Sequence, residues 1–169
     1  GLAGNFYWAP MSQVRHADGH LETFPHIVTD RAKPGVIGVT DKGARFTNEG
    51  DSYHRFVKGM MEQQRQGITR FYLISDHRAL RAYGLGLARP SPGVNTALEK
   101  NGYLIKANTI AELAKLIDID PAALEATIAE HNRDAVNGYD TKFQKGESSY
   151  NKAQGDITLP NAGIAPIVN

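Results

Sequence analysis

Residues 43–56 read GARFTNEGDSYHRF and lie between a predicted strand and a predicted helix. The apolar run 36–39 precedes them, and the turn signal at 41–43 separates the two segments. Residues 52–64 place apolar side chains at helical spacing, which predicts a helix after the stretch. The polar side chains gathered between strand and helix are Arg45, Asn48, Glu49, Asp51, Ser52, Tyr53 and His54. A polar loop held by two regular elements is a frequent place for chemistry, and the alternative is that Asp51 or Ser52 only caps the helix.

Length and composition favour one soluble globular domain. The 169 residues are 41% hydrophobic and 22% charged, and the chain is long enough to bury a core. A formal net charge of +1 provides no basic surface for nucleic acid. The chain has no cysteine, which excludes disulfides and thiolate metal ligands and fits a reducing compartment, so we expect a cytoplasmic protein. No run has the apolar length of a membrane span, and the first residues lack the pattern of a signal peptide.

The first 25 residues predict a β-hairpin. Residues 11–15 and 20–24 flank Asp18-Gly19, a dipeptide that favours a tight hairpin turn. The aromatic residues 6–8 are expected in the core or at an interface. His16, His20 and His26 have irregular spacing and no carboxylate at ligand spacing, so we expect surface histidines and no metal site.

Strands and helices alternate through the middle of the chain. Residues 70–75 show the strongest strand pattern, and Asp76 is expected to cap a helix that reaches Tyr83. Residues 103–107 predict a further strand. These elements predict an α+β fold with a small mixed or antiparallel sheet and flanking helices.

Two helices are predicted from their end signals. Thr109 and Glu112 have the spacing of a capping box, so a helix is expected to run to about residue 117. Asp120-Pro121 is expected to begin another helix, and Gly138 to end it. Residues 139–169 show no clear periodicity, so we expect this tail to be disordered or to pack against a part of the protein outside this chain.

The polar stretch resembles the substrate-side, or capping, domain of FAD-dependent flavoproteins related to fumarate reductase and succinate dehydrogenase. The shared motif is Arg-Phe-x-Asn-Glu followed, after a short gap, by Tyr-His-x-Phe, and it is similar above all to the 3-ketosteroid dehydrogenase-like branch. Further resembling segments follow in the family's order at 30–37, 108–114, 120–132 and 155–167. The resemblance covers nearly the whole chain.

This resemblance implies that residues 1–169 are a single capping domain that belongs to a larger FAD-binding protein. The chain lacks the Gly-x-Gly-x-x-Gly segment that places the FAD pyrophosphate at a helix N-terminus; Gly84 and Gly86 do not complete it. FAD would therefore be bound mainly by a separate FAD-binding domain of the same polypeptide, which both ends of this chain would re-enter. The implied protein is an FAD-dependent oxidoreductase, and the isolated chain is expected to be inactive.

The resemblance also implies site residues, with departures from the family pattern. Alignment on Asn48-Glu49 puts Tyr53 where fumarate reductases carry an arginine acid. Of the upstream Glu-x-x-Arg pair, Arg31 matches the arginine if one residue is inserted, but Val28 stands at the glutamate position. These departures disfavour fumarate or succinate chemistry. In the ketosteroid branch a tyrosine at this place helps to remove a proton beside a ketone.

Tyr53 is therefore the predicted catalytic residue, and the alternative is that it belongs to the core. A tyrosine hydroxyl ordinarily has a pKa of about 10, so a tyrosine base needs a nearby donor or positive charge. Arg31, Arg45, His54 and Arg55 are the candidates in sequence. The side chains predicted to face the substrate or FAD are Arg31, Arg45, Asn48, Glu49, Ser52 and His54.

The sequence thus predicts the substrate-binding and catalytic cap of an FAD-dependent dehydrogenase that acts on a small apolar ketone such as a 3-oxosteroid. One alternative is a reductase of fumarate or another unsaturated carboxylate, which would need a cationic clamp. Another is a non-catalytic ligand-binding or interaction domain. An exposed apolar face would favour the cap, whereas a fully polar surface with an ordered tail would favour an independent module.

Overall fold

The computed structural model describes residues 9–91 and 93–168. Phe6, Tyr7 and Trp8, which were expected in the core or at an interface, lie outside the described residues. The helices are α1 (Tyr53–Gln64), α2 (His77–Tyr83), α3 (Thr96–Lys100), α4 (Ile110–Leu116), α5 (Pro121–Asn137) and α6 (Ser149–Gln154). Within the described part of the chain, no helix has both the length and the apolar composition needed to cross a membrane.

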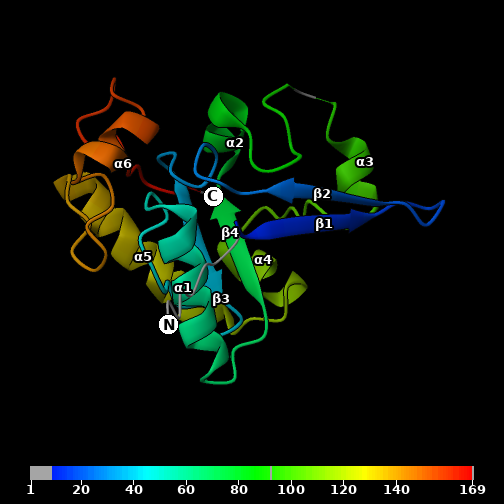
Figure 1. Cartoon of the computed structure of the whole chain (residues 1–169). Helices are drawn as coiled ribbons and strands as arrows, with labels where there is room; N and C mark the ends of the chain where they lie inside the picture. Colours follow the sequence, from blue (N-terminus) through cyan, green and yellow to red (C-terminus); the bar gives the residue numbers. More distant parts are fainter. Residues whose placement is uncertain (1–8, 92, 169) are drawn as a thin grey trace, which may run out of the picture.

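The strands form two separate antiparallel pairs. β1 (Met11–Arg15) and β2 (Leu21–Pro25) make the predicted hairpin, which extends to one side of the molecule (Figure 1). β3 (Val36–Thr40) pairs with β4 (Phe71–Ser75), and α1 connects these two strands. The predicted α+β class is confirmed, with the β structure divided into two small sheets.

The hydrophobic core lies between the β3–β4 pair and the helices α4 and α5. Ile37 pairs with Ile74 in the ladder, and both side chains belong to the buried core cluster. Leu124 and Ile128 of α5 fill the opposite side with exposed fractions of 0% and 2%. The other members of this cluster are Val39, Ala114, Ile117, Ile119 and Ile167.

The second face of the β3–β4 pair is covered by α1 and the segment before it. A Cβ at Gly38 would lie 3.4 Å from the Phe46 ring and 3.5 Å from the Phe56 ring. A side chain larger than a methyl group would therefore push these aromatic rings away from the strand. Phe46 also packs edge-on against Phe56, with ring centroids 5.3 Å apart.

Most helix ends follow their sequence signals. The Ser52 hydroxyl accepts the Arg55 N–H of α1 at 3.4 Å, and the Thr109 hydroxyl accepts the Glu112 N–H of α4 at 3.1 Å. α5 begins at Pro121 after its cap Asp120 and ends at Gly138, whose φ of 76° is the left-handed conformation that glycine adopts readily. These predictions are confirmed.

The C-terminal tail packs on this domain, so the expectation of disorder was wrong, while packing against a part of the protein outside this chain stays a prediction. Ile167 is part of the core cluster, and Asn151 of α6 is only 1% exposed. The Asn132 side-chain N–H donates to the Ile167 carbonyl at 2.7 Å and ties the tail to α5. Periodicity missed this segment because buried polar side chains, rather than a repeating apolar stripe, attach much of it.

The strand predicted at residues 103–107 was also wrong. These residues form bends and irregular chain, and Tyr103, Leu104 and Ile105 line a cavity instead. β-Branched and aromatic residues form a strand only where a neighbouring strand pairs with them. The β4 register pairs that strand with β3, and no ladder includes residues 103–107.

We predict that Leu124→Ala lowers the free energy of unfolding by about 2–5 kcal/mol, because it leaves a cavity in the core. Val136→Ala is the matched control on the same helix, since Val136 is 78% exposed. Its effect should stay within about 0.5 kcal/mol. Urea denaturation followed by circular dichroism measures both values, and equal effects would contradict the placement of the core.

Candidate functional site

A buried ionic network holds the stretch 43–56 in place. The Arg45 guanidinium donates to Glu49 Oε2 at 2.7 Å and to Asp140 Oδ2 at 2.8 Å. Lys145 Nζ lies 3.9 Å from Glu49 Oε2. The side chains of Glu49, Asp140 and Lys145 are 0% exposed, and that of Arg45 is 5% exposed. Two cations and two carboxylates therefore balance one another inside the domain.

The network also satisfies the outer edge of β3. Glu49 Oε1 accepts the Gly38 N–H at 2.9 Å, and the Lys145 ammonium donates to the Val36 carbonyl at 2.6 Å. Main-chain groups at a buried strand edge need such partners, because an unpaired one costs about 1–3 kcal/mol. Side chains thus replace a further strand on this side of the sheet.

Burial and charge set the protonation states in the network. Burial alone would raise the pKa of Glu49, but the positive charges of Arg45 and Lys145 outweigh it and hold that pKa below its ordinary value. The pKa of Asp140 is also lowered, since Arg45 more than offsets the burial of the carboxyl. Burial lowers the pKa of Lys145 to about 8.

Arg31 braces the same loop from inside. Its exposed fraction is 0%, and it donates to the carbonyl groups of His26 at 3.0 Å and Asp51 at 2.6 Å. It also donates to the carbonyls of Ile27 and Glu49. A guanidinium bonded only to main-chain carbonyls fixes the path of the backbone, and here it joins residues 26–27 to residues 49–51.

Asn48 links the loop to the tail. Its side-chain amide donates to the Phe143 carbonyl at 3.0 Å and to Asn151 Oδ1 at 2.9 Å, and its Oδ1 accepts the Gly50 N–H at 2.8 Å. The tail contributes Asp140, Lys145 and Asn151 to this region, and sequence analysis missed all three. Their partners lie roughly a hundred residues away in the chain, so no local pattern could indicate them.

The predicted site residues divide into two groups. The side chains of Arg31, Arg45, Asn48 and Glu49 are directed inward and are used in the contacts above, so in this chain they support the loop. Ser52, Tyr53 and His54 lie at its surface end, where α1 begins. Tyr53 is 44% exposed, which is not the exposure of a core residue. An orientation toward substrate or FAD stays a prediction for all of the predicted site residues.

The cations predicted beside Tyr53 are mostly engaged elsewhere. Arg31 and Arg45 are held in the buried contacts, and Arg55 pairs with Asp51 at 3.4 Å. The first residue of α1 is Tyr53 itself, so it lies at the positive end of the helix dipole. Negative charge near this helix end is stabilised by the main-chain N–H groups of its first turn.

The loop from Gly84 to Leu87 is not shaped as a pyrophosphate site. The loop from Gly84 to Leu87 is closed by a bridge between Leu85 and Ala88. The Tyr103 hydroxyl fills the space beside Gly86, where a Cβ would lie 2.2 Å from it. This loop has no open cradle for a pyrophosphate. Over the described ranges no cluster of three His, Cys, Asp or Glu side chains could hold a metal ion.

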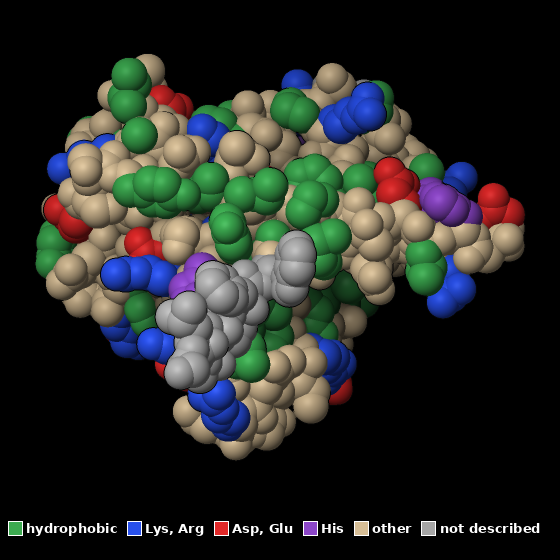
Figure 2. All heavy atoms as spheres, viewed as in Figure 1, with side chains coloured by type: hydrophobic (Ala, Val, Ile, Leu, Met, Phe, Trp, Pro, Cys, Tyr) green, Lys and Arg blue, Asp and Glu red, His purple; other side chains and the backbone are tan. Residues whose placement is uncertain are grey.

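Hydrophobic side chains reach the surface in several places. Figure 2 shows them gathered across the middle of one face. Met11, Ile27 and Tyr53 are 51%, 49% and 44% exposed. His26, expected on the surface, is instead buried at 7%, because it is enclosed between the hairpin and the segment 30–31.

Residues 2–166 match the model of the FAD binding domain family. The chain is 40% identical over 164 residues to 4-oxocyclohex-2-ene-1-carboxylate 5-dehydrogenase of Sinomonas cyclohexanicum, covering 95% of this chain and 27% of that protein. It is 30% identical over 148 residues to 3-oxosteroid 1-dehydrogenase of Mycolicibacterium smegmatis, covering 83% and 26%.

A solved structure agrees with these matches. The crystal structure of 3-ketosteroid delta1-dehydrogenase from Sterolibacterium denitrificans with 1,4-androstadiene-3,17-dione superposes with a TM-score of 0.80 and 30% identity, covering 96% of this chain and 30% of that chain. The chain spans only 27% and 26% of the length of these two curated relatives.

We predict that Arg45→Met destabilises the fold by about 3–5 kcal/mol, because it leaves the buried carboxylates of Glu49 and Asp140 without their shared cation. Arg55→Met is the matched control, since the Arg55 side chain is 74% exposed and also pairs with a carboxylate. Its effect should be below about 1 kcal/mol. Urea denaturation measures both, and a mild effect of Arg45→Met would contradict the central role of the network.

We predict that His131 makes the free energy of unfolding depend on pH. Burial, with the charges of Arg45 and Lys145, lowers the pKa of His131 to about 4 from its ordinary 6.5. Between these values the unfolded chain binds a proton that the folded chain does not, so stability falls as the pH drops from 6.5 to 4. The loss should be on the order of 3 kcal/mol.

His131→Gln tests this prediction because it removes the titrating ring. Among the described residues His131 Nδ1 has no hydrogen-bond partner, while Nε2 contacts the Ala165 carbonyl at 3.1 Å, a contact that an amide N–H can also make. As the pH falls from 6.5 to 4, the wild-type protein should lose about 3 kcal/mol of unfolding free energy relative to His131→Gln. Parallel curves would contradict the prediction.

Proposed function

We propose that this chain, which belongs to the FAD binding domain family, is the substrate-side domain of an FAD-dependent dehydrogenase of cyclic ketones. FAD is the cofactor of that family, and the predicted resemblance to 3-ketosteroid dehydrogenase-like flavoproteins is confirmed by the sequence and structure matches. The observation that carries the proposal is the exposed Tyr53 on a rigidly braced loop. Residues 1–169 would act with an FAD-binding domain of the same polypeptide.

Dehydrogenation of a ketone requires removal of a proton and a hydride from adjacent carbon atoms. Bound FAD supplies the hydride acceptor, and the protein supplies the proton acceptor and the geometry. Tyr53 is the proposed proton acceptor, because it is 44% exposed and is the first residue of α1, at the positive end of the helix dipole. The adjacent Ser52 and His54 are proposed to face the substrate or FAD. The buried network keeps all three in a fixed position.

The surface supports a cap rather than an independent module. Its exposed apolar side chains are what a domain would present to a partner domain and an apolar ring substrate. The ordered tail would support an independent module only together with a fully polar surface. A fumarate-type cap is less favoured, since Arg31 and Arg45 are used inside the domain and cannot clamp a carboxylate there.

Two types of cyclic ketone are candidate substrates. A 3-oxosteroid is the first, supported by the resemblance at Tyr53 and by the relatives named for 3-oxosteroids. A 4-oxocyclohexene carboxylate is the second, supported by the 40% identity to an enzyme named for that compound. Turnover of one and not the other would assign the substrate within the same chemistry.

We predict that Tyr53→Phe slows reduction of bound FAD by about 10²–10⁴-fold, because the proton acceptor is lost. The full-length protein is made anaerobic, mixed with a 3-oxosteroid or with 4-oxocyclohex-2-ene-1-carboxylate, and followed by loss of flavin absorbance. Tyr139→Phe is the matched control, since Tyr139 is 43% exposed and follows α5 in the sequence, outside α1. It should reduce FAD at the wild-type rate.

The same experiment separates the alternatives. A colourless protein would contradict the flavoenzyme and favour a non-catalytic binding domain. Bleaching by succinate, with neither ketone active, would favour carboxylate chemistry. Ketone-driven bleaching that is unchanged by Tyr53→Phe would keep the dehydrogenase and remove Tyr53 as its proton acceptor.

A further inference from the structure

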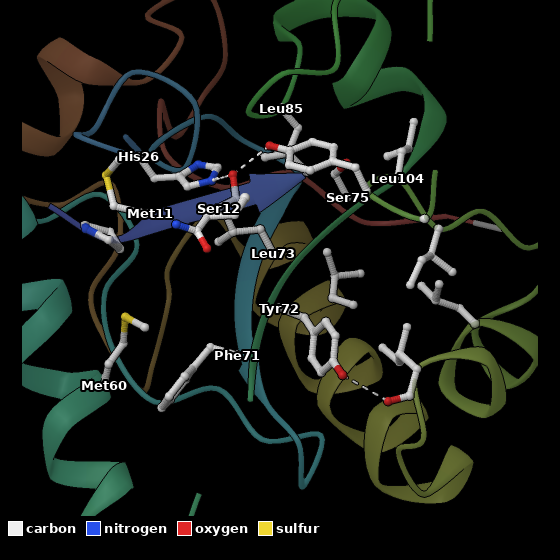
Figure 3. Close-up of a pocket in the computed structure, with 18 of the residues that line it drawn as sticks. Met11, Ser12, His26, Met60, Phe71, Tyr72, Leu73, Ser75, Leu85 and Leu104 are labelled. Carbon is white, nitrogen blue, oxygen red and sulfur yellow. Dashed lines mark hydrogen bonds between the residues drawn. The ribbon is translucent and has the colours of Figure 1, made fainter. Parts of the chain in front are cut away.

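A cavity of about 310 Å³ lies between β4, the start of β1 and the loop at 102–105 (Figure 3). Most of its lining is apolar, with Met11, Met60 and Phe71 on one side. One corner is polar and holds Ser12, His26 and Tyr103. Tyr53 does not line this cavity. An apolar pocket with a few converging polar groups is typical of a ligand or catalytic site.

The polar corner is a continuous hydrogen-bonded chain. Asp30 Oδ2 bonds His26 Nδ1. His26 Nε2 lies 2.7 Å from Ser12 Oγ, as Figure 3 shows. Ser12 Oγ lies 2.7 Å from the Tyr103 hydroxyl, and the Leu87 N–H donates to that hydroxyl at 3.0 Å. This series of hydrogen bonds joins the hairpin, the segment 26–30 and the two loops that contain residues 87 and 103.

The Asp30 carboxylate can orient the donors along this series of hydrogen bonds. Burial would raise the pKa of Asp30, but its contacts with His26 outweigh this and lower that pKa, so the carboxylate only accepts. In the tautomer in which His26 Nδ1 donates to this carboxylate, Nε2 accepts, and Ser12 donates its proton to Nε2. The Tyr103 O–H is left to donate to Ser12 Oγ.

The surrounding backbone is shaped around this chain. Gly86 has φ +58°, donates its N–H to Asp30 Oδ2 at 3.1 Å, and would place a Cβ 2.2 Å from the Tyr103 hydroxyl. Only a glycine leaves room for the hydroxyl at that point. Arg31 Nε holds the His26 carbonyl at 3.0 Å, which fixes the backbone that carries the imidazole.

We propose that Ser12, His26 and Asp30 are the nucleophile, general base and orienting carboxylate of a second, hydrolytic site in this domain. Its substrate class is an ester whose apolar portion occupies the cavity. The arrangement has the connectivity of a serine-hydrolase triad, in which a base bonds the nucleophile and a carboxylate orients the base. Tyr103 is the proposed donor to the oxyanion, because its hydroxyl lies 2.7 Å from Ser12 Oγ and a tyrosine hydroxyl can serve in that role.

The proposed reaction uses only the ester and water. Ser12 Oγ attacks the carbonyl carbon as its proton passes to His26 Nε2, and the Tyr103 O–H stabilises the oxyanion. The bond from the carbonyl carbon to the alcohol oxygen breaks, and His26 gives the proton to the departing alcohol. Water then attacks the acyl-serine with His26 as base, the acyl–Oγ bond breaks, and Ser12 recovers its proton as the carboxylic acid leaves.

An alkyl fluorophosphonate tests the nucleophile in the full-length protein. The expected result is one phosphonyl group on Ser12, located by peptide mass spectrometry, together with hydrolysis of p-nitrophenyl butyrate. Ser12→Ala should abolish both, and Asp30→Asn should slow labelling at least about a hundredfold by removing the orienting carboxylate. Tyr103→Phe should slow ester hydrolysis by about 10²–10³-fold.

Ser75→Ala is the matched control, because Ser75 lines the same cavity without contacting His26. The Ser75→Ala protein should be labelled at Ser12 at the wild-type rate. Its labelling at other residues should not exceed that of the wild-type protein. Absence of an adduct on Ser12 of the wild-type protein, or ester hydrolysis unchanged by Ser12→Ala, would overturn the proposal. Since the adduct is read by mass and not by flavin reduction, its failure would leave the proposed dehydrogenation untouched.

Discussion

The ion pairs of Arg45 with Glu49 and Asp140 are the interaction on which the rest of the structure depends. One arginine joins the loop after β3 to the segment after α5, although 95 positions separate Arg45 from Asp140. Buried charges are tolerated only when they are paired and hydrogen-bonded, and here Lys145 completes the balance. The Glu49 carboxylate also accepts the Gly38 N–H of β3. The network therefore provides a hydrogen-bond partner at the edge of the sheet and also holds the loop in place.

This bracing has a functional consequence for the end of the loop. Arg31 and Asn48 attach its backbone from two further sides, so the chain enters α1 along one path. A surface tyrosine on such a support can hold its hydroxyl in one place, which acid–base chemistry requires. The charged side chains of the buried network support Tyr53 from inside the domain and are not part of the surface around it. The Ser12–His26–Asp30 chain is a separate polar assembly, since it lies at the cavity beside β4.

Local signals predicted most of the secondary structure. Asp18-Gly19 marked the hairpin, Asp120-Pro121 and Gly138 marked both ends of α5, and the β3 and β4 runs were recognised from their apolar residues. The strand expected at 103–107 failed because a strand needs a partner that composition does not reveal. The short helices α3 and α6 were missed, since five or six residues give too little periodicity to detect.

The sequence by itself determined the class of fold, the order of its main elements and, through the Arg-Phe-x-Asn-Glu and Tyr-His-x-Phe motifs, the flavoprotein family. It also marked Tyr53 as a candidate, because the residue type at that place differs from the fumarate reductase pattern. Only the tertiary structure decided which polar residues are buried supports and which are exposed. It also brought Ser12 to His26, and Arg45 to Asp140. These outcomes depend on contacts between distant segments, and burial and pairing across such distances leave no periodic trace in the chain.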